Sequence, residues 1–324
     1  MCYRSRISSL LVAVLLVFAS AALTTAQDIV YLKKTSGDGE SKRKGEIVQW
    51  LGDTISIKGK TGVKEFDTSR LIRFETAWHP GYEQGKLLQA NYRYPAAIEQ
   101  FTSALENEPR AWMQNIVHAR LLECFLAIED FGGAAIHFSK LIDDDPNSRF
   151  RHLAPLVWTS SRPKKRQLQA AQQWLESDEV IMSLMGASWL LDSSEKAQQK
   201  MQALSRDFDP TVASLAEVQL WRLEKVPPNA KRLALRVDRI RTMPEKVRCG
   251  AWYRLAEDQV KTGQPDQAIV NYMRVIVNDP QQGTLAAASL YQVAWLLKKT
   301  NRGQQSQALR NELKEKFGDT IWAQ

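Results

Sequence analysis

The residues best suited to chemistry are spread through the chain without the spacing that a reaction or a metal site requires. The four histidines are His79, His118, His137 and His152. A zinc hydrolase would place two histidines and a glutamate within one helical turn, and a structural zinc site would need closely paired cysteines. Neither pattern occurs, and there is no glycine-rich phosphate loop and no Gly-x-Ser-x-Gly turn. We therefore expect no catalytic residues and no cofactor.

Two further groups could bind or react, and each has a simpler interpretation. Asp143, Asp144 and Asp145 form an acidic run that could attract calcium, but the oxygen spacing of a calcium loop is missing and the run lies where a helix is predicted to end. Cys124 and Cys249 are far apart and are expected to be small buried apolar residues. We therefore expect no metal. A catalytic site in the atypical segment 151–247 is kept as an alternative.

Residues 1–26 have the properties of an export signal. Arg4 and Arg6 precede an apolar run from Leu10 to Ala22, and small residues lead up to Gln27. The run is shorter than the roughly 20 residues that span a bilayer. We predict cleavage after Ala26 and a periplasmic or secreted protein; an uncleaved anchor is the alternative.

The net charge indicates a weak preference for anionic surfaces. The whole chain carries +8, and removal of residues 1–26 removes two arginines and no acid, which leaves +6. The densest basic runs are 42–44 and 164–166, which we expect to be solvated loops. The composition is 44% apolar and 25% charged, which is typical of a globular protein large enough for several packing units.

A ladder of residues occurs three times in the chain. It begins at Ala97, Ala134 and Ala268. An aromatic residue follows after four positions, an aliphatic residue after eight and a proline after twelve; the aromatic residues are Phe101, Phe138 and Tyr272, and the prolines are Pro109, Pro146 and Pro280. Steps of four lie on one face of a helix, and proline ends it. Each ladder follows another helical pattern, so each unit is predicted to be a helix, a turn and a helix.

These units resemble the tetratricopeptide repeat. Residues 249–282 carry the resemblance through Trp252, Leu255, Ala256, Ala268, Tyr272 and Pro280. Residues 78–111 match through Gly85, Ala97, Phe101, Ala104 and Pro109. Residues 115–148 match through Leu121, Ala134, Phe138 and Pro146, although Leu122 replaces a small residue. Residues 287–320 resemble a degenerate copy with Ala294, Leu297, Leu313 and Gly318.

The resemblance implies a helical solenoid whose first helices line a concave groove for a peptide or an extended segment. Eight residues of this sequence fall on the groove positions and form the predicted partner-binding set: Tyr82, Lys86, Tyr253, Glu257, Lys261, Tyr291, Trp295 and Lys298. The tryptophans Trp112, Trp174, Trp189 and Trp252 fall within helical patterns and are expected in the core.

The middle of the chain, residues 151–247, is helical in pattern but lacks the ladder. Asp209 followed by Pro210 predicts a capped helix start, and Asp192 with Glu195 predicts another. Residues 159–166 are the best linker candidate. We expect either worn repeats or a related antiparallel helical module.

Residues 27–77 instead alternate apolar and polar positions, with glycines between five short runs. This pattern predicts a small closed β-barrel and weakly resembles Sm-like and SH3-like barrels through Val30, Leu32, Gly45, Ile47, Asp53, Ile55 and Ile57. Sm proteins bind RNA, but no basic strand face rich in aromatic residues supports RNA binding here.

The prediction is therefore a mainly α protein, with a tetratricopeptide-like solenoid after a five-stranded barrel. Its expected parts are a signal peptide (1–26), the barrel (27–77), repeats (78–150), atypical helical pairs (151–247) and repeats (248–324). We expect a non-enzymatic scaffold or adaptor of the bacterial envelope that binds a protein or peptide partner, with no nucleic acid and no small-molecule substrate. The alternative is an accessory module of a cell-wall or envelope enzyme, with the barrel contacting the polymer.

Overall fold

The computed structural model describes residues 27–36, 38–278 and 283–323 and divides the chain into two compact units. The first contains residues up to 48 together with 54–77, and the second contains 49–53 and everything from Trp78 onward. The predicted signal peptide and Pro280 lie outside the described residues. The described part is mainly helical, with a five-stranded antiparallel sheet at its N-terminal end.

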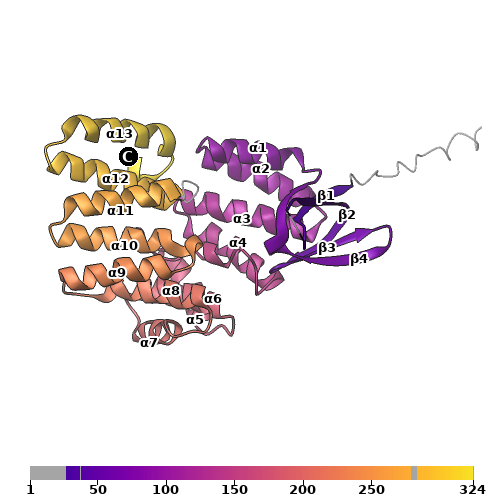
Figure 1. The fold of residues 1–324 in the computed structure, drawn as a ribbon. Helices are drawn as coiled ribbons and strands as arrows, with labels where there is room; N and C mark the ends of the chain where they lie inside the picture. Colours follow the sequence, from indigo (N-terminus) through magenta and orange to yellow (C-terminus); the bar gives the residue numbers. More distant parts are fainter. Residues whose placement is uncertain (1–26, 37, 279–282, 324) are drawn as a thin grey trace, which may run out of the picture. The chain divides into compact units, whose positions relative to one another are not determined.

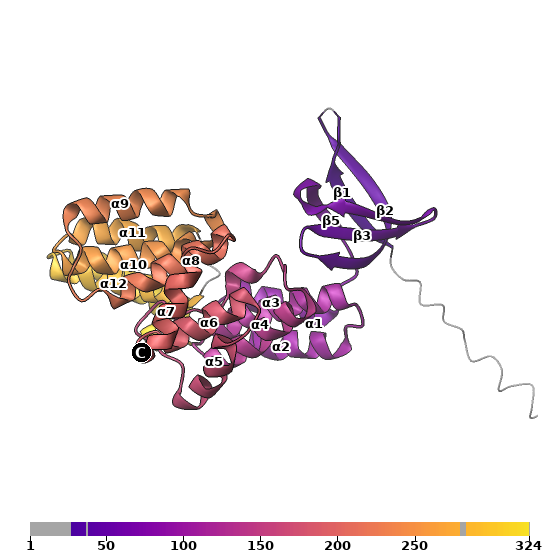
Figure 2. The same cartoon turned by 90° about the horizontal axis from the view of Figure 1, so that it is seen from below.

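The first unit is built on one sheet. Its strands are β1 (Asp28–Lys33), β2 (Glu40–Leu51), β3 (Thr54–Gly59), β4 (Gly62–Asp67) and β5 (Leu71–Glu75). Their order is β4-β3-β2-β1-β5, so the five predicted strands are confirmed and β4 and β5 are the edges. Figure 2 shows this unit in indigo. Alternation places Val30, Leu32 and Ile55 on the buried face. The Asp28 carboxylate accepts hydrogen bonds from the Ile47 N–H at 2.7 Å and the Thr76 hydroxyl at 2.5 Å. These two bonds connect the start of β1 to β2 and to the residue that follows β5.

One detail of this sheet differs from the sequence prediction. The basic run 42–44 lies within β2 and not in a loop, with Lys42 paired opposite Tyr31 of β1. All three side chains are exposed, because this part of β2 has its polar residues at solvent-facing positions. The other run, 164–166, is exposed as expected.

The second unit is helical (Figure 1). Its first four helices are α1 (Pro80–Ala90), α2 (Tyr94–Asn107), α3 (Ala111–Ala127) and α4 (Phe131–Asp144). The middle helices are α5 (Leu168–Leu175), α6 (Val180–Leu190), α7 (Glu195–Leu204), α8 (Pro210–Leu220) and α9 (Ala230–Thr242). The last four are α10 (Arg248–Lys261), α11 (Pro265–Asn278), α12 (Gly283–Lys299) and α13 (Gly303–Phe317).

The ladder residues lie where the repeat pattern predicts. Ala97, Ala134 and Ala268 are fully buried in α2, α4 and α11, and each of these helices packs on the helix before it. The aromatic residues of the ladders are buried as well. In the first pair, a Cβ on Gly85 of α1 would lie 2.6 Å from the Phe101 ring, so only glycine permits this contact. The prediction of helical hairpins held by close contact at these alanines is confirmed.

The turns show that four hairpins share one geometry. The second residue after each first helix has positive φ: Tyr92 (58°), Glu129 (59°), Gly263 (73°) and Asn301 (59°). The next N–H donates back to the carbonyl five residues earlier in every case, over distances of 2.8–2.9 Å: Arg93 to Leu88, Asp130 to Phe125, Gln264 to Gln259 and Arg302 to Leu297. This is the hydrogen bond of a Schellman helix end. The fourth hairpin, α12–α13, therefore repeats the other three despite its degenerate sequence.

The middle helices start at capping residues, one of which differs from the prediction. The Asp209 side chain accepts from Thr211 N–H at 2.7 Å and caps α8 as predicted. The cap of α7 is Ser194 and not Asp192. Asp192 instead accepts hydrogen bonds from two arginines, which accounts for its place before the helix. Within the described residues, no helix combines the length and hydrophobicity needed to span a membrane.

Candidate functional site

The predicted groove positions are best realised on α12. Tyr291 and Trp295 are 42% and 37% exposed, and Lys298 is exposed one turn further along. Residues at i, i+4 and i+7 lie on one face of a helix, so the three side chains form a row. We call Tyr291, Trp295 and Lys298 the α12 stripe. It brings together three of the eight predicted residues.

The rest of α12 is almost entirely buried, which makes the stripe stand out. Small and aliphatic residues cover its other faces, namely Leu285, Ala286, Ala287, Ala288, Leu290, Val293, Ala294, Leu296 and Leu297. These residues pack on α11, α13, α10 and α3. A helix held on so many sides is a rigid support for the side chains that it exposes.

Aromatic and cationic groups surround the stripe. The ring of Trp322 lies 5.7 Å from the Tyr291 ring, and its indole N–H donates to the Glu129 carboxylate at 3.0 Å. The ammonium of Lys299 lies 5.4 Å from the Trp295 ring centroid, within the range of a cation–π contact. The stripe is thus an aromatic surface with a positive end.

The same positions on α10 are largely covered, which corrects part of the prediction. Tyr253 is 1% exposed, packs edge-on to Tyr272 and contacts Gln292. Burial raises the pKa of its phenol. Glu257 is half-buried and paired with Arg254. Tyr253 therefore belongs to the core and is removed from the binding set, because it has no surface to offer a partner.

Lys261 is the one predicted α10 residue that is exposed, and its ammonium lies 3.7 Å from the Asp258 carboxylate. On α1, Tyr82 is 4% exposed and stacks on Trp78 with ring centroids 4.0 Å apart, so it too is a core residue. Lys86 is exposed and pairs with Glu83 at 3.2 Å. The structure therefore does not bring the α1 residues into one surface with the α12 stripe.

A non-helical connector, residues 154–164, that sequence reasoning misread lies beside these helices. The predicted linker, residues 159–166, is mostly exposed, but Thr159 and Pro163 within it are buried, and Val157 just before it is fully buried. The Val157 N–H donates to Ser188 Oγ at 3.0 Å, and its carbonyl accepts from Gln219 Nε2 at 3.2 Å. The connector is therefore part of the core of the second unit. The apolar run Leu153–Trp158, interrupted by one proline, was the available signal.

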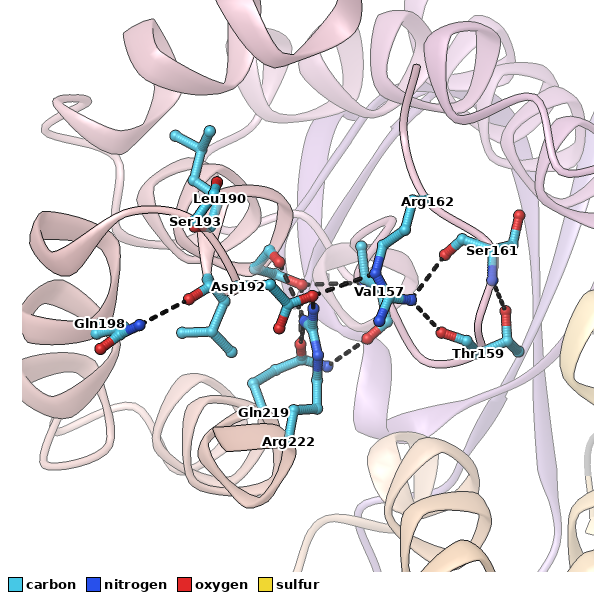
Figure 3. A network of polar contacts seen from close by, with 12 residues as sticks. Val157, Thr159, Ser161, Arg162, Leu190, Asp192, Ser193, Gln198, Gln219 and Arg222 are labelled. Atoms are coloured by element: carbon cyan, nitrogen blue, oxygen red, sulfur yellow. Dashed lines mark hydrogen bonds and ion pairs between the residues drawn. The ribbon is translucent and has the colours of Figure 1, made fainter. Parts of the chain in front are cut away.

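The far end of the connector enters a polar network (Figure 3). Arg222 donates to the Asp192 carboxylate at 2.7 Å and to Gln219 Oε1 at 2.6 Å, and Arg162 reaches the same carboxylate at 3.2 Å. Burial lowers the pKa of Arg222 to about 10, which leaves it cationic at neutral pH. The charged and amide side chains of this network are hydrogen-bonded to one another, which is typical of a structural network rather than of a reactive centre.

A cavity of about 60 Å³ lies between the connector, α3, α8, α10 and α12. Its lining is mainly apolar and includes Leu126, Leu156, Trp158, Leu215 and Leu285. The volume holds a few water molecules and is far below that of a pocket for a drug-sized ligand. We do not assign it a substrate.

The histidines have structural contacts. His118 and His137 face each other across α3 and α4 with Nδ1 atoms 2.8 Å apart, and His79 accepts from the Gly81 N–H at the start of α1. His152 lies 3.0 Å from the Arg149 carbonyl. Among the described residues, no three histidine, cysteine or acidic side chains cluster as metal ligands.

The remaining reactive residues also have structural positions. Cys124 and Cys249 are both buried, as predicted, and they form no disulfide bond. Asp145 ends its helix by accepting from the Asn147 N–H at 3.1 Å. Trp112, Trp189 and Trp252 are buried and Trp174 partly so, as expected for core tryptophans. The α12 stripe therefore remains the surface best suited to a function.

Comparison with known proteins adds no family to this picture. No protein-family model matches the chain, and neither a curated protein nor a solved structure resembles it closely enough to count as a match. What the protein does has to be argued from its own residues.

Proposed function

We propose that this protein is a non-enzymatic scaffold or adaptor that binds a protein or peptide partner on the first helices of a tetratricopeptide-like solenoid. The observation that carries the proposal is the α12 stripe: a helix buried on its other faces exposes Tyr291 and Trp295 in one row. Aromatic side chains on a rigid support supply much of the binding energy in protein interfaces. The shared turn geometry of four hairpins supports the repeat interpretation.

The proposed setting is the bacterial envelope, in assembly or secretion. It rests on the export signal predicted for residues 1–26 and on the mild positive charge of the chain.

The test is site-directed photo-crosslinking in the source cell. A photoreactive phenylalanine analogue at position 295 is compared with the same analogue at position 208, because Phe208 is fully exposed in the α7–α8 loop. A partner crosslinked only from position 295 is then purified. Tyr291→Ala with Trp295→Ala should weaken its binding at least tenfold, as expected for two aromatic contacts. Phe208→Ala should leave binding unchanged.

Two results would contradict the proposal. One is equal crosslinking from positions 295 and 208, and the other is an affinity that the double variant does not alter. Circular dichroism of both variants at the assay temperature shows that the comparison is made between folded proteins.

A second candidate function involves the sheet of the first unit. The Arg73 guanidinium lies 3.4 Å from the Tyr31 ring centroid and the Lys42 ammonium 5.4 Å from it, so one face offers an aromatic ring beside two cations, of which Arg73 also pairs with Glu75 at 2.8 Å. Such a face suits an anionic wall polymer. Cosedimentation with purified wall material should be lost in Tyr31→Ala with Arg73→Ala and retained in Tyr291→Ala with Trp295→Ala. The opposite pattern would exclude this function.

A further inference from the structure

We propose that the partner segment bound at the α12 stripe is a short, non-helical, acidic stretch of polypeptide. It places an apolar side chain on Tyr291 and Trp295 and its carboxylates on Lys298 and Lys299. This inference rests on the proposed function and adds the chemical class of the partner. Charge, shape and an internal precedent support it.

The charge argument comes from the cations at the end of the stripe. Among the described residues, neither Lys298 nor Lys299 forms an ion pair, whereas Lys261 of α10 already lies near Asp258. The two acids on α10, the first helix of the preceding hairpin, are already in ion pairs. Glu257 pairs with Arg254, and Asp258 pairs with Arg236. At the Tyr291 end the Glu129 carboxylate accepts hydrogen bonds from Trp322 and Ser161, so the charges left unpaired at the Lys298 end are positive, and a negatively charged partner complements them.

The shape argument comes from the width of the stripe. It is one residue wide and runs from Tyr291 to Lys298, seven residues or about 10 Å along the helix. An amphipathic helix needs an apolar groove with several anchor positions, and this row offers two aromatic rings. Three residues of extended chain cover about 10 Å. The binding motif should therefore be about three or four residues long.

The internal precedent is the connector 154–164, which lines the same small cavity as the start of α12. Thr284 lies two turns before Tyr291 on α12 and lines the cavity together with Leu156 and Trp158. The connector shows how neighbouring helices hold a non-helical chain. Side chains bind its backbone, and besides the two contacts of Val157 the Trp189 indole N–H donates to the Pro155 carbonyl at 2.6 Å.

The two ends of this α12 face differ in what covers them. The end near Thr284 packs on α3, because the Thr284 hydroxyl donates to the Leu126 carbonyl, while the end that carries Tyr291, Trp295 and Lys298 is exposed. A partner segment would thus lie on the exposed end.

The experiment selects phage-displayed random 12-residue peptides on the mature chain, residues 27–324. Peptides that also bind Tyr291→Ala with Trp295→Ala are discarded. The remaining sequences should share a motif with one aromatic or leucine residue and at least two acids. Synthetic peptides should lose at least tenfold in affinity against Lys298→Glu with Lys299→Glu, and their affinity should fall as salt rises from about 50 to 500 mM.

A matched pair of charge reversals controls for net charge. Lys225 and Lys231 are exposed lysines near the start of α9, away from the stripe in sequence, and they have no ion pair among the described residues. Lys225→Glu with Lys231→Glu changes the total charge by the same amount and should leave peptide affinity within twofold.

The outcomes separate this inference from the proposed function. Stripe-dependent peptides that are neutral or basic, or that bind the Lys298→Glu with Lys299→Glu variant normally, overturn the acidic partner and leave the adaptor standing. A selection with no stripe-dependent peptide overturns both. Sedimentation velocity tests the remaining alternative, which is that a second copy of the chain covers the α12 stripe. A dimer of the mature chain that Trp295→Ala dissociates would show this and overturn the inference.

Discussion

Tyr253 of α10 and Tyr291 of α12 occupy the same position in neighbouring hairpins, yet one is 1% exposed and the other 42%. Tyr253 packs on Tyr272 of α11 and contacts Gln292 of α12, so helices lie on both sides of it. Tyr291 has Trp322 as its described ring neighbour. The repeat register thus determines which face of a helix a residue occupies, while the neighbouring elements decide whether solvent reaches that face.

The largest expected effect on stability comes from substituting these two tyrosines one at a time. Tyr253→Ala removes a buried aromatic side chain and should lower the free energy of unfolding by about 3–5 kcal/mol. Tyr291→Ala removes a half-exposed one and should cost less than about 1 kcal/mol. Urea unfolding of the two variants, followed by circular dichroism, measures both. Equal losses would mean that the two tyrosines share one environment and that the α12 stripe is part of the core.

The hairpin repeat could be predicted from sequence because its signal is local. Ala97, Ala134 and Ala268 recur at a fixed distance from an aromatic residue, and the contact that requires them lies within one hairpin. The fate of Tyr253 and Tyr82 could not be predicted in this way. Their burial depends on side chains that come from other helices, or from Trp78 before the first helix.

The connector and most of the turns were missed for different reasons. The apolar run of residues 153–158 was a signal of burial, but it has no helical or strand period that would assign it to an element. Of the four left-handed turn residues, Gly263 and Asn301 are of the types that favour such a turn, and Gly263 was expected as a break between helices. Tyr92 and Glu129 carry no such signal.

The α3–α4 hairpin contains two facing histidines, His118 and His137, whereas the described residues of the α12–α13 hairpin include no histidine. Burial lowers the pKa of His118 to about 4, helped by Lys140, and burial lowers that of His137 to about 4, helped by His118. The ordinary value is 6.5. As the pH falls below 6.5, these histidines bind protons in the unfolded chain but stay neutral in the folded chain. The free energy of unfolding therefore decreases until about pH 4.

The expected loss is roughly 3 kcal/mol for one such histidine between pH 7 and pH 4. His118→Gln with His137→Gln should flatten this part of the pH dependence, even if the variant is less stable at pH 7. Urea unfolding at pH 7, 6, 5 and 4.5 gives the slopes. Wild-type and variant slopes that coincide over this range would show that the pair does not titrate on unfolding.

The smallest expected effect concerns the turns that the four hairpins share. Gly263 and Asn301 both have positive φ, 73° and 59°, and a Cβ built on Gly263 meets no atom within 4 Å. Gly263→Ala should therefore lower stability by about 1 kcal/mol through backbone strain alone. Asn301→Gly should raise the stability, because glycine has no Cβ to strain at positive φ. The gain should be only a few tenths of a kcal/mol, since asparagine tolerates this conformation better than alanine does. Thermal unfolding resolves the two signs. If both substitutions instead destabilise to a similar extent, φ is not what the two turns have in common, and the side chain of Asn301 contributes a contact of its own to the end of α12.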